Sequence, residues 1–301
     1  MEPFAGLAVW TAYQSKTIES LRAKTSAKEQ GDSGLREDCA VVFVEPRKHT
    51  SSEYVLRNMR YFLPTWTIIV VHSKANEQFM RDICAGIRGN FKFIDCKVPD
   101  LPIPSYNTLF TCPEFWKQLP RYVLIAQTDT LLMKPASEYL ESFIARNFSF
   151  VGAPWSYSCN RCKKPLSEGC GHMIDQVVVN SLAPHMVGNG GLSFRDTHTM
   201  IEICSRYCLE AKPCDLVSLA WSRPTGREVM KGTTNEDVFY NMGIRTLNKP
   251  VPSRLEALEF AVEQVAPLSW NATVPAMGAH KPWAYLSLPF VECMLNLVKY
   301  T

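Results

Sequence analysis

The sequence predicts an α/β fold in which a single domain contains a mixed sheet with helices on both faces. Short runs of aliphatic and β-branched residues at 40–45, 66–72 and 122–126 are typical of strands buried on both faces. Segments with helical spacing alternate with these runs through the first half of the chain. That alternation favours a parallel or mixed sheet over an all-helical or all-strand fold.

The remaining elements of the first half follow from spacing and from prolines. Pro64 ends the first of the expected helices because it cannot continue a helical ladder. A proline-rich stretch at 99–104 interrupts the pattern before the third helix. The expected elements are helices at 54–63, 76–87 and 107–118 and a short strand at 91–94.

The second half is less regular. A strand and a turn are expected at 148–155, and a loop-like insert with Cys, Gly, Pro and Lys occupies 156–187. Helices are expected at 197–209, from 236 onward and at 254–264.

Charge and hydropathy exclude two classes of partner. The net charge of +3, without a long basic run, gives no basis for nucleic-acid binding. No stretch approaches the roughly 20 apolar residues of a transmembrane segment, and the first residues do not look like a signal peptide. The eleven cysteines are odd in number and mostly lie in apolar surroundings, which favours a reducing, cytoplasmic compartment.

The chain is expected to contain one large domain at 38–301, which includes the insert at 156–187. Residues 1–37 are polar in their second half and rich in Lys, Ser, Glu and Gly. They are expected to form an N-terminal lead-in, with a short helix followed by a flexible segment.

A carboxylate closes the apolar run at 122–126. Gln127, Thr128 and Asp129 follow it directly, at the point where the strand leaves the sheet. In open α/β sheets this edge is where ligands bind. A nucleotide diphosphate binds together with a hard cation, which prefers oxygen ligands. The alternative is that Asp129 only caps the following turn.

Several short motifs, in this order and spacing, resemble a glycosyltransferase of the GT-A fold. More narrowly, the chain resembles a glycosyltransferase-like family long catalogued as a domain of unknown function. The resemblance covers about residues 38–285. Its anchors are V-E-P-R at 44–47, Q-T-D-T at 127–130, V-G-A-P-W at 151–155, G-N-G-G-L-S-F-R at 188–195, E-D-V-F-Y at 236–240, F-A-V-E at 260–263 and G-A-H-K-P-W at 278–283.

The resemblance implies transfer of a sugar from a nucleotide-sugar donor, such as a UDP-sugar, to a hydroxyl of a glycan or glycoconjugate acceptor. In GT-A enzymes an Asp-x-Asp motif ends the corresponding strand, and its last Asp typically contacts Mn²⁺ or Mg²⁺. That position is Asp129 here. Gln127 stands at the first motif position. Gln127 and Thr128 are both expected to bind the donor. Gln127 brings no charge, which leaves strict metal dependence open.

His280 and Lys281 are the expected partners of Asp129. Some GT-A families end with a His near a Lys-Pro-Trp, where the His ligates the metal and the Lys meets the diphosphate. Imidazole suits Mn²⁺, and Lys is a good point charge for phosphate. The resemblance therefore implies His280 as a metal ligand and Lys281 and Trp283 at the donor. The alternative is a surface His and Lys beside a core Trp.

An acidic pair, Glu236-Asp237, opens an expected helix that Asn235 or Thr234 can cap. Acids are common there because they complement the helix dipole. In inverting GT-A enzymes, the Asp that follows a Glu removes the acceptor proton. The resemblance implies Asp237 as the general base and Glu236 as an acceptor-binding residue. The helix N-terminus is expected to keep Asp237 ionised.

Two further segments are expected at the donor. Glycines allow backbone to approach a ligand closely, and the resemblance places Asn189, Gly190 and Gly191 along the donor sugar and acceptor. The alternative is a tight turn before a strand. Glu45 and Arg47 are expected near the nucleotide base and ribose, the alternative being an exposed ion pair.

The insert contains a possible structural zinc site. Cys159 and Cys162 have zinc-ligand spacing, and Cys170 and His172 follow closely. The alternative is a set of free thiols in a loop, because one intervening residue in the second pair is awkward for tetrahedral coordination.

Two function classes remain open at this point. A transferase is favoured by the E-D pair and by H-K-P-W, because binding alone needs no base. A non-catalytic nucleotide- or carbohydrate-binding module on the same fold is favoured by the missing first acid of Q-T-D-T. A zinc-loop interaction protein is a third interpretation.

Overall fold

The computed structural model of the chain describes residues 3–27, 36–155, 188–207, 235–264 and 276–300. Its centre is a six-stranded mixed sheet with the order β3-β2-β1-β4-β7-β6. The four strands β3, β2, β1 and β4 are parallel, and β7 runs antiparallel to both β4 and β6. The strands are β1 (Arg36–Val44), β2 (Trp66–His72), β3 (Phe91–Asp95), β4 (Tyr122–Ala126), β6 (Phe150–Gly152) and β7 (Leu192–Asp196).

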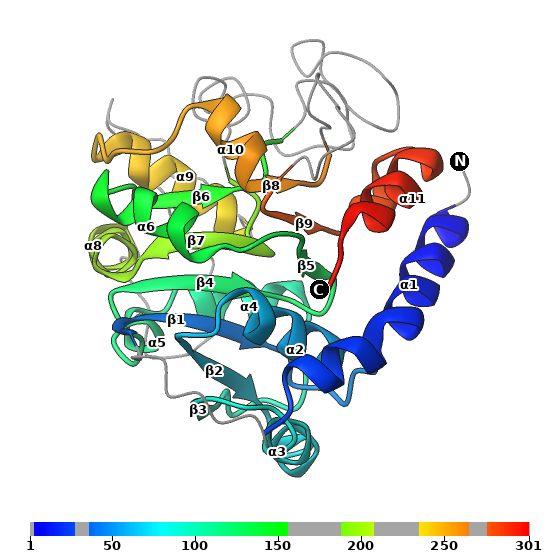
Figure 1. Cartoon of the computed structure of the whole chain (residues 1–301). Coiled ribbons are helices and arrows are strands. Elements are labelled where there is room, and N and C mark those ends of the chain that lie inside the picture. Colours follow the sequence, from blue (N-terminus) through cyan, green and yellow to red (C-terminus); the bar gives the residue numbers. More distant parts are fainter. Residues whose placement is uncertain (1–2, 28–35, 156–187, 208–234, 265–275, 301) are drawn as a thin grey trace.

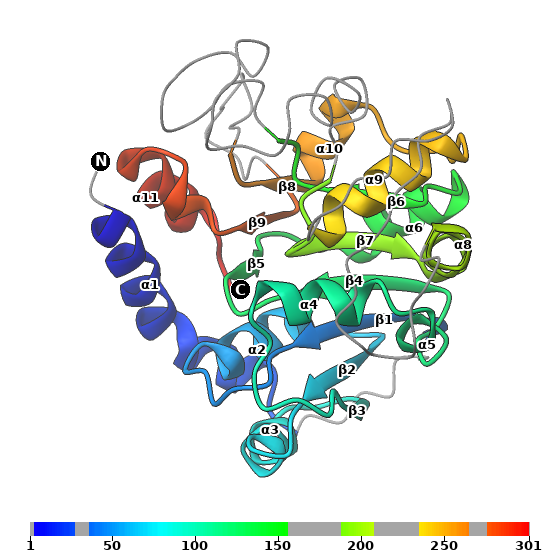
Figure 2. The same ribbon diagram turned by 180° about the vertical axis from the view of Figure 1, so that it is seen from behind.

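Helices cover both faces of this sheet (Figures 1 and 2). The helices of the described residues are α1 (Pro3–Lys24), α2 (Ser52–Phe62), α3 (Glu77–Ala85), α4 (Ile103–Phe110), α5 (Pro113–Trp116), α6 (Ser137–Ala145), α8 (Thr197–Tyr207), α9 (Glu236–Thr246), α10 (Arg254–Phe260), the 3₁₀ helix η3 (Pro282–Ala284) and α11 (Leu288–Leu297). The mixed sheet with helices on both faces, predicted from the sequence, is confirmed.

Alternate residues of the central strands enter two separate hydrophobic clusters. Val41 and Phe43 of β1 pack into one cluster, whereas Val42 and Val44 pack into the other. Successive side chains of a strand point to opposite faces, so a strand covered on both sides must be apolar throughout. This explains the continuous aliphatic runs in the sequence. Each fully buried Val side chain contributes roughly 1.5–3 kcal/mol relative to an exposed one.

A second sheet of three short strands adjoins the first. It has the order β5-β9-β8, made of β5 (Thr130–Leu132), β8 (Ala261–Val262) and β9 (Gly278–His280). β5 and β9 are antiparallel, with Thr130 opposite His280. β8 and β9 are parallel. This small sheet brings the end of β4 and the C-terminal part of the chain to one place.

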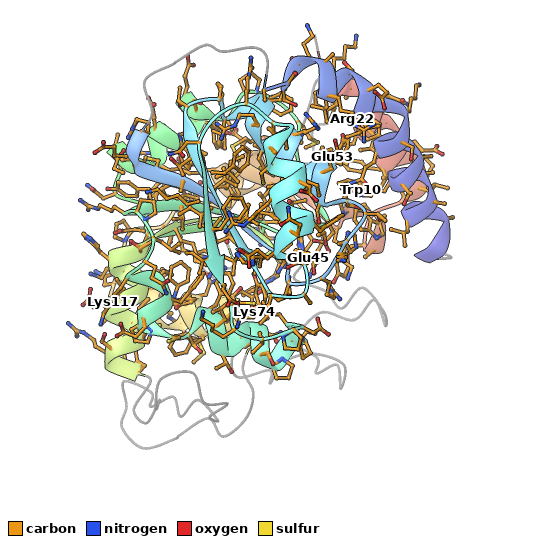
Figure 3. All side chains as sticks on the ribbon, turned by 90° about the horizontal axis from the view of Figure 1, so that it is seen from below. Trp10, Arg22, Glu45, Glu53, Lys74 and Lys117 are labelled. Atoms are coloured by element: carbon orange, nitrogen blue, oxygen red, sulfur yellow. The ribbon has the colours of Figure 1, made fainter. Side chains whose placement is uncertain are left out.

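The N-terminal helix is longer than the expected short helix. α1 spans 22 residues and packs against α2, η3 and α11. The ring centroids of Trp10 and Trp283 lie 4.4 Å apart, and Arg22 forms an ion pair with Glu53 at 2.7 Å (Figure 3). Residues 3–24 therefore pack on the rest of the protein. The domain boundary at residue 38 stays a prediction.

Two expected helices differ in extent from those observed. The helix expected at 107–118 is interrupted, because Pro113 disfavours helical geometry at the preceding residue; Cys112 is extended, with φ −88° and ψ 118°. The helix expected at 254–264 ends at Phe260, and the next two residues form β8. No helix in the described part of the chain has the length and apolarity needed to cross a membrane.

Candidate functional site

A tight turn joins β4 to β5 and carries the first group of candidate residues. β4 ends at Ala126, and β5 begins at Thr130. The backbone N–H and the hydroxyl of Thr130 both donate to the carbonyl of Gln127, at 3.2 and 2.7 Å. The turn therefore fixes the positions of Thr128 and Asp129. The Asp129 side chain is 26% exposed.

The structure brings His280 beside Asp129, as the sequence predicts. Thr130 and His280 pair in register, and the N–H of Lys281 donates to the carbonyl of Asp129 at 2.9 Å. The Nε2 atom of His280 lies 3.3 Å from Oδ1 of Asp129. The pairing of β5 with β9 thus places the imidazole of His280 beside the carboxylate of Asp129.

Glu263 completes this cluster and was missed by the sequence analysis. It follows β8, is buried, and places Oε1 3.2 Å from Nδ1 of His280. The Asn189 amide donates to the same Oε1 at 3.0 Å. His280 therefore lies between two carboxylates. The only sequence signal was the F-A-V-E motif, in which Glu263 has no distinctive spacing.

The two carboxylates control the charge of His280. Burial opposes protonation of the ring, but the adjacent Asp129 and Glu263 outweigh it and raise the pKa of His280 to about 10. Burial likewise opposes ionisation of Asp129, yet His280 and Lys281 hold its pKa below the usual value. Both pKa shifts therefore favour the charged forms of the two side chains.

Three atoms of this cluster are buried without a hydrogen-bond partner: Asp129 Oδ1, His280 Nε2 and Glu263 Oε2. Asp129 and His280 are close enough for ion pairing but not aligned for a hydrogen bond. Unpartnered buried polar atoms are costly, which is typical of a site that accepts a ligand.

The fit to a metal ion depends on how many ligands the protein must supply. Within the described residues, no three His, Cys, Asp or Glu side chains gather in a geometry that could hold a metal. The oxygen of Asp129 and the nitrogen of His280, which lie 3.3 Å apart and make no hydrogen bond, do fit a two-residue site. Such a site is completed by water and substrate phosphates, as is usual for Mg²⁺, and its mixed O and N donors suit Mn²⁺.

The glycine-rich loop lies between this cluster and helix α9. A Cβ on Gly191 would come within 2.1 Å of Nε2 of His280, and a Cβ on Gly190 within 2.0 Å of Oε1 of Glu236. The loop is held by Asn189, whose Oδ1 accepts a hydrogen bond from the Gly191 N–H at 2.8 Å. Only glycine permits backbone to pass this closely between the two groups.

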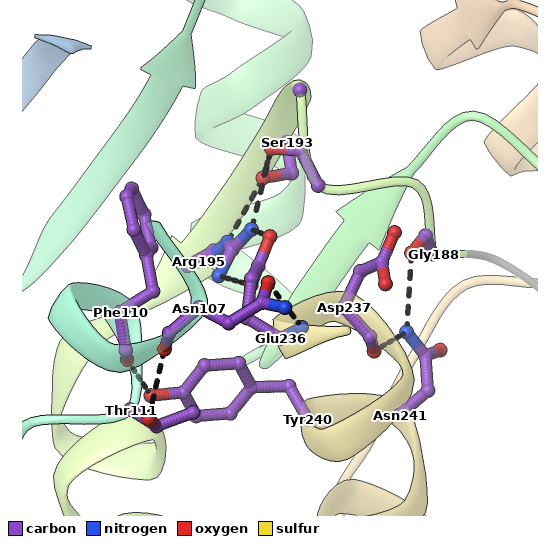
Figure 4. Close-up of polar contacts among 12 residues, drawn as sticks. Asn107, Phe110, Thr111, Gly188, Ser193, Arg195, Glu236, Asp237, Tyr240 and Asn241 are labelled. Atoms are coloured by element: carbon purple, nitrogen blue, oxygen red, sulfur yellow. Dashed lines mark hydrogen bonds and ion pairs between the residues drawn. The ribbon is translucent and has the colours of Figure 1, made fainter. Parts of the chain in front are cut away.

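Glu236 forms a buried ion pair with Arg195, another residue that the sequence analysis missed (Figure 4). The guanidinium donates to both carboxylate oxygens, at 2.6 and 3.0 Å. Its Nε donates to the hydroxyl of Ser193 at 2.9 Å. The guanidinium carbon lies within 4.8 to 5.6 Å of the ring centroids of Phe110, Trp116, Phe150 and Tyr240.

This pairing occupies the Glu236 carboxylate. The backbone N–H of Glu236 donates to Oδ1 of Asn107, while Asn235 at the cap position makes no side-chain capping bond. The expected side-chain cap is therefore wrong for Asn235. The acceptor-binding role of Glu236 stays a prediction.

Asp237 is the next residue along α9 and is half-buried. Figure 4 shows its carboxylate on the side of Gly188, away from the ion pair. One of its oxygens accepts the N–H of Val238 at 2.8 Å. Burial, with the nearby charge of Glu236, raises the pKa of Asp237 to about 7. The helix N-terminus therefore does not hold the pKa of Asp237 at its usual value, and the expectation that this carboxylate starts ionised stays a prediction.

The remaining donor candidates are Glu45, Arg47, Lys281 and Trp283. Arg47 donates to both oxygens of Glu45, at 2.8 and 3.1 Å, so these two residues form an ion pair with a buried carboxylate and an exposed guanidinium. Lys281 is exposed, and Trp283 packs on Trp10. The donor roles of these residues stay predictions.

The possible zinc site lies outside the described residues. Cys159, Cys162, Cys170 and His172 all belong to the segment 156–187, so the zinc site stays a prediction.

No curated protein matches the chain. Among solved structures, the bifunctional glycosyltransferase WbbM is 11% identical over 84% of this chain and 46% of its own, with a TM-score of 0.47. Mouse xyloside xylosyltransferase 1 is 10% identical over 72% of this chain and 84% of its own, with a TM-score of 0.42. Glucosyl-3-phosphoglycerate synthase from Mycobacterium tuberculosis, in complex with Mn²⁺, UDP and phosphoglyceric acid, is 13% identical over 60% of this chain and 59% of its own, with a TM-score of 0.35.

These likenesses are distant and say nothing about activity. The chain spans less than half the length of WbbM. A family described as a protein of unknown function (DUF5672) matches residues 91–280, more than half of the chain. The matched segment contains Asp129, Glu263 and His280 as well as the acidic pair of α9. The chain therefore belongs to this family of proteins of unknown function.

Proposed function

We propose that the protein is a glycosyltransferase that moves a sugar from a nucleotide-sugar donor, a UDP-sugar, to a hydroxyl of a glycan or glycoconjugate acceptor. The observation that carries this proposal is the buried cluster of Asp129, His280 and Glu263, in which one atom of each side chain makes no hydrogen bond. Such a cluster has the donor set for a cation that accompanies a diphosphate. The carboxylate of Asp237 lies on α9, across the glycine loop from it.

The first requirement of the reaction is to stabilise the diphosphate leaving group. Asp129 and His280 would hold Mn²⁺ or Mg²⁺, which supplies positive charge to the phosphate oxygens when bound. Glu263 accepts a hydrogen bond from Nδ1 of His280 and thereby fixes the ring orientation and leaves Nε2 facing Asp129. Lys281 adds a point charge for the same diphosphate.

The second requirement is a base for the acceptor. The carboxylate of Asp237 takes the proton of the acceptor hydroxyl while that oxygen forms a bond to the anomeric carbon of the donor sugar. The bond from this carbon to the diphosphate oxygen breaks, and its electron pair stays with the phosphate. One displacement inverts the anomeric configuration. A pKa of about 7 suits a base that works at neutral pH.

The other side chains orient the substrates in this proposal. Asn189, Gly190 and Gly191 line the donor sugar, Gln127 and Thr128 bind hydroxyls of the donor, and Trp283 supports Lys281. Glu45 and Arg47 lie toward the nucleoside. Glu236, which is paired with Arg195, positions the first turn of α9 and so the carboxylate that follows it.

A reducing compartment is the proposed setting of the reaction. Glycan biosynthesis in the cytoplasm agrees with the free thiols of Cys39, Cys84, Cys96 and Cys293, which a reducing compartment would preserve.

A donor-hydrolysis screen tests the proposed function. The full chain is incubated with UDP-, GDP-, ADP- and CMP-sugars, with and without Mn²⁺, and release of the nucleotide is measured. We expect slow hydrolysis of one donor class, faster with Mn²⁺ and much reduced in Asp237→Asn. Absence of hydrolysis and of donor binding across the panel would contradict the proposal.

A second candidate is a non-catalytic nucleotide- or carbohydrate-binding module. It is favoured by Gln127, which brings no charge at a position where the resembled enzymes have a carboxylate. Tight binding of one donor in the same screen, without hydrolysis and without transfer to any acceptor, would support this candidate.

A further inference from the structure

A groove of roughly 570 Å³ lies between the N-terminal helix and the proposed diphosphate site. One wall is α1, and the other is formed by the loop after β1 and the start of α2. Its inner end contains Thr128, Asp129, Lys281 and Trp283. The volume is in the range of small-molecule sites. The family match begins only at residue 91, so α1 lies outside the matched segment.

One side chain of α1 that lines this groove has an unused hydrogen-bond donor. Gln14 is only 8% exposed, and it lines the groove. Its Oε1 accepts a hydrogen bond from the hydroxyl of Ser51 at 3.0 Å, which fixes the orientation of the amide. Its Nε2 is buried without a partner. A buried N–H without a partner is costly, so this donor fits an acceptor oxygen of a ligand.

The position of the groove identifies the part of the substrate that it fits. A nucleotide sugar is a linear molecule in which the diphosphate joins the nucleoside to the sugar. Asp129 and Lys281 bound the groove, but Asp237 and the glycine loop do not line it. If the diphosphate lies at Asp129 and Lys281, and the sugar lies toward Asp237, the groove is left for the nucleoside.

The chemistry of the groove agrees with a nucleoside. Trp283, which is half-buried and packs on the buried Trp10, offers aromatic surface. The hydroxyl oxygens of Thr11, Ser15 and Ser51 donate within the protein and can still accept hydrogen bonds from ribose hydroxyls. The charged side chains of Arg22 and Glu53 pair with each other, so they add no net charge to this wall of the groove.

We propose that α1 completes the nucleoside pocket of the donor and that Gln14 donates a hydrogen bond from Nε2 to an oxygen of the bound nucleoside. This inference rests on the proposed function, because the orientation of the donor follows from a diphosphate at Asp129 and Lys281. It makes the N-terminal helix part of the substrate site.

The test is calorimetric binding of UDP, GDP, ADP and CDP, each with Mn²⁺, to the full chain. Gln14→Ala removes the amide, and Gln14→Met removes the donor while keeping most of the volume. We expect the best-binding nucleotide to bind about three- to tenfold more weakly to both variants, as for one lost hydrogen bond. Inorganic pyrophosphate should bind to both variants as it does to wild type.

The matched control is Gln78→Ala on α3, an exposed glutamine whose amide bonds only to Asp82. It should leave nucleotide affinity unchanged. Wild-type affinity for the nucleotide in both Gln14 variants overturns the role of α1 but leaves the proposed function intact. Failure of every nucleotide and of pyrophosphate to bind wild type overturns both.

Discussion

The Nε2 atom of His280 lies 3.3 Å from Oδ1 of Asp129, although Asp129 precedes β5 and His280 ends β9. The antiparallel pairing of these two short strands fixes the approach, and Glu263 holds the opposite side of the ring. The three side chains therefore act as a unit. A change in any of them is expected to alter the ligand properties of the other two.

Glu263→Gln is expected to weaken Mn²⁺ binding by about 10- to 100-fold, the usual cost of losing a carboxylate behind a ligating histidine. The amide keeps the shape of the side chain and an oxygen that can accept from Nδ1, but it has no negative charge to strengthen this hydrogen bond and raise the basicity of the ring. Mn²⁺ affinity is measured by titration with paramagnetic resonance detection.

The control for this change is Glu259→Gln, which alters an exposed carboxylate four residues earlier. It should leave Mn²⁺ affinity at the wild-type value. Equal affinities in Glu263→Gln and Glu259→Gln would show that Glu263 does not position His280.

Glu236→Gln is expected to lower the free energy of unfolding by about 3–5 kcal/mol, because it leaves the buried guanidinium of Arg195 without its counter-charge. Chemical denaturation followed by fluorescence measures this loss. Glu202→Gln, which removes a more exposed carboxylate paired with Arg206 and Lys249, should cost about 0–1 kcal/mol. An unfolding midpoint for Glu236→Gln near that of Glu202→Gln would disprove the structural role.

Asp237→Asn is expected to lower the turnover number by about 10²–10⁴ while donor affinity stays near wild type, because a general base acts in the transition state. Transfer kinetics and calorimetry measure the two quantities separately. A variant that retains wild-type turnover, or a product with the anomeric configuration of the donor, would rule out Asp237 as the base of an inverting reaction.

The raised pKa of Asp237 also predicts a pH dependence of stability. The folded state holds the proton of Asp237 up to about pH 7, whereas the unfolded chain releases it near about pH 4. Between these values the folded state binds more protons, so the contribution of Asp237 to stability falls as pH rises. Asp237→Asn should therefore raise the melting temperature relative to wild type more at pH 8 than at pH 5. An equal difference at both pH values would contradict the raised pKa.

The central strands could be predicted from the sequence because each is a continuous run of apolar residues. The apolar runs that became β1, β2 and β4 are buried on both faces, so nearly every residue contributes to the pattern. The proximity of Asp129 and His280 could be predicted for a related reason, since each stands where an apolar segment ends at one sheet edge.

Residues whose roles depend on distant partners could not be predicted. Glu263 follows a strand of two residues, which is too short to show a period. Leu192 and Phe194 lie on one buried face of β7, and Arg195 lies on the opposite face. Only the folded structure shows that this opposite face is also buried, where Arg195 pairs with Glu236. The docking of α1 depends on contacts such as Trp10 with Trp283, at opposite ends of the chain.

The most direct test of the account is the binding of UDP to wild type and to Asp129→Asn, each with Mn²⁺ and with a chelator, by calorimetry. Asp95→Asn, at the end of β3 and paired with Lys97, is the matched control. We predict that Mn²⁺ strengthens UDP binding to wild type and to Asp95→Asn, whereas Asp129→Asn binds UDP equally weakly with and without the metal. A gain in affinity with Mn²⁺ that persists in Asp129→Asn would contradict the assignment of this cluster as the diphosphate and metal site.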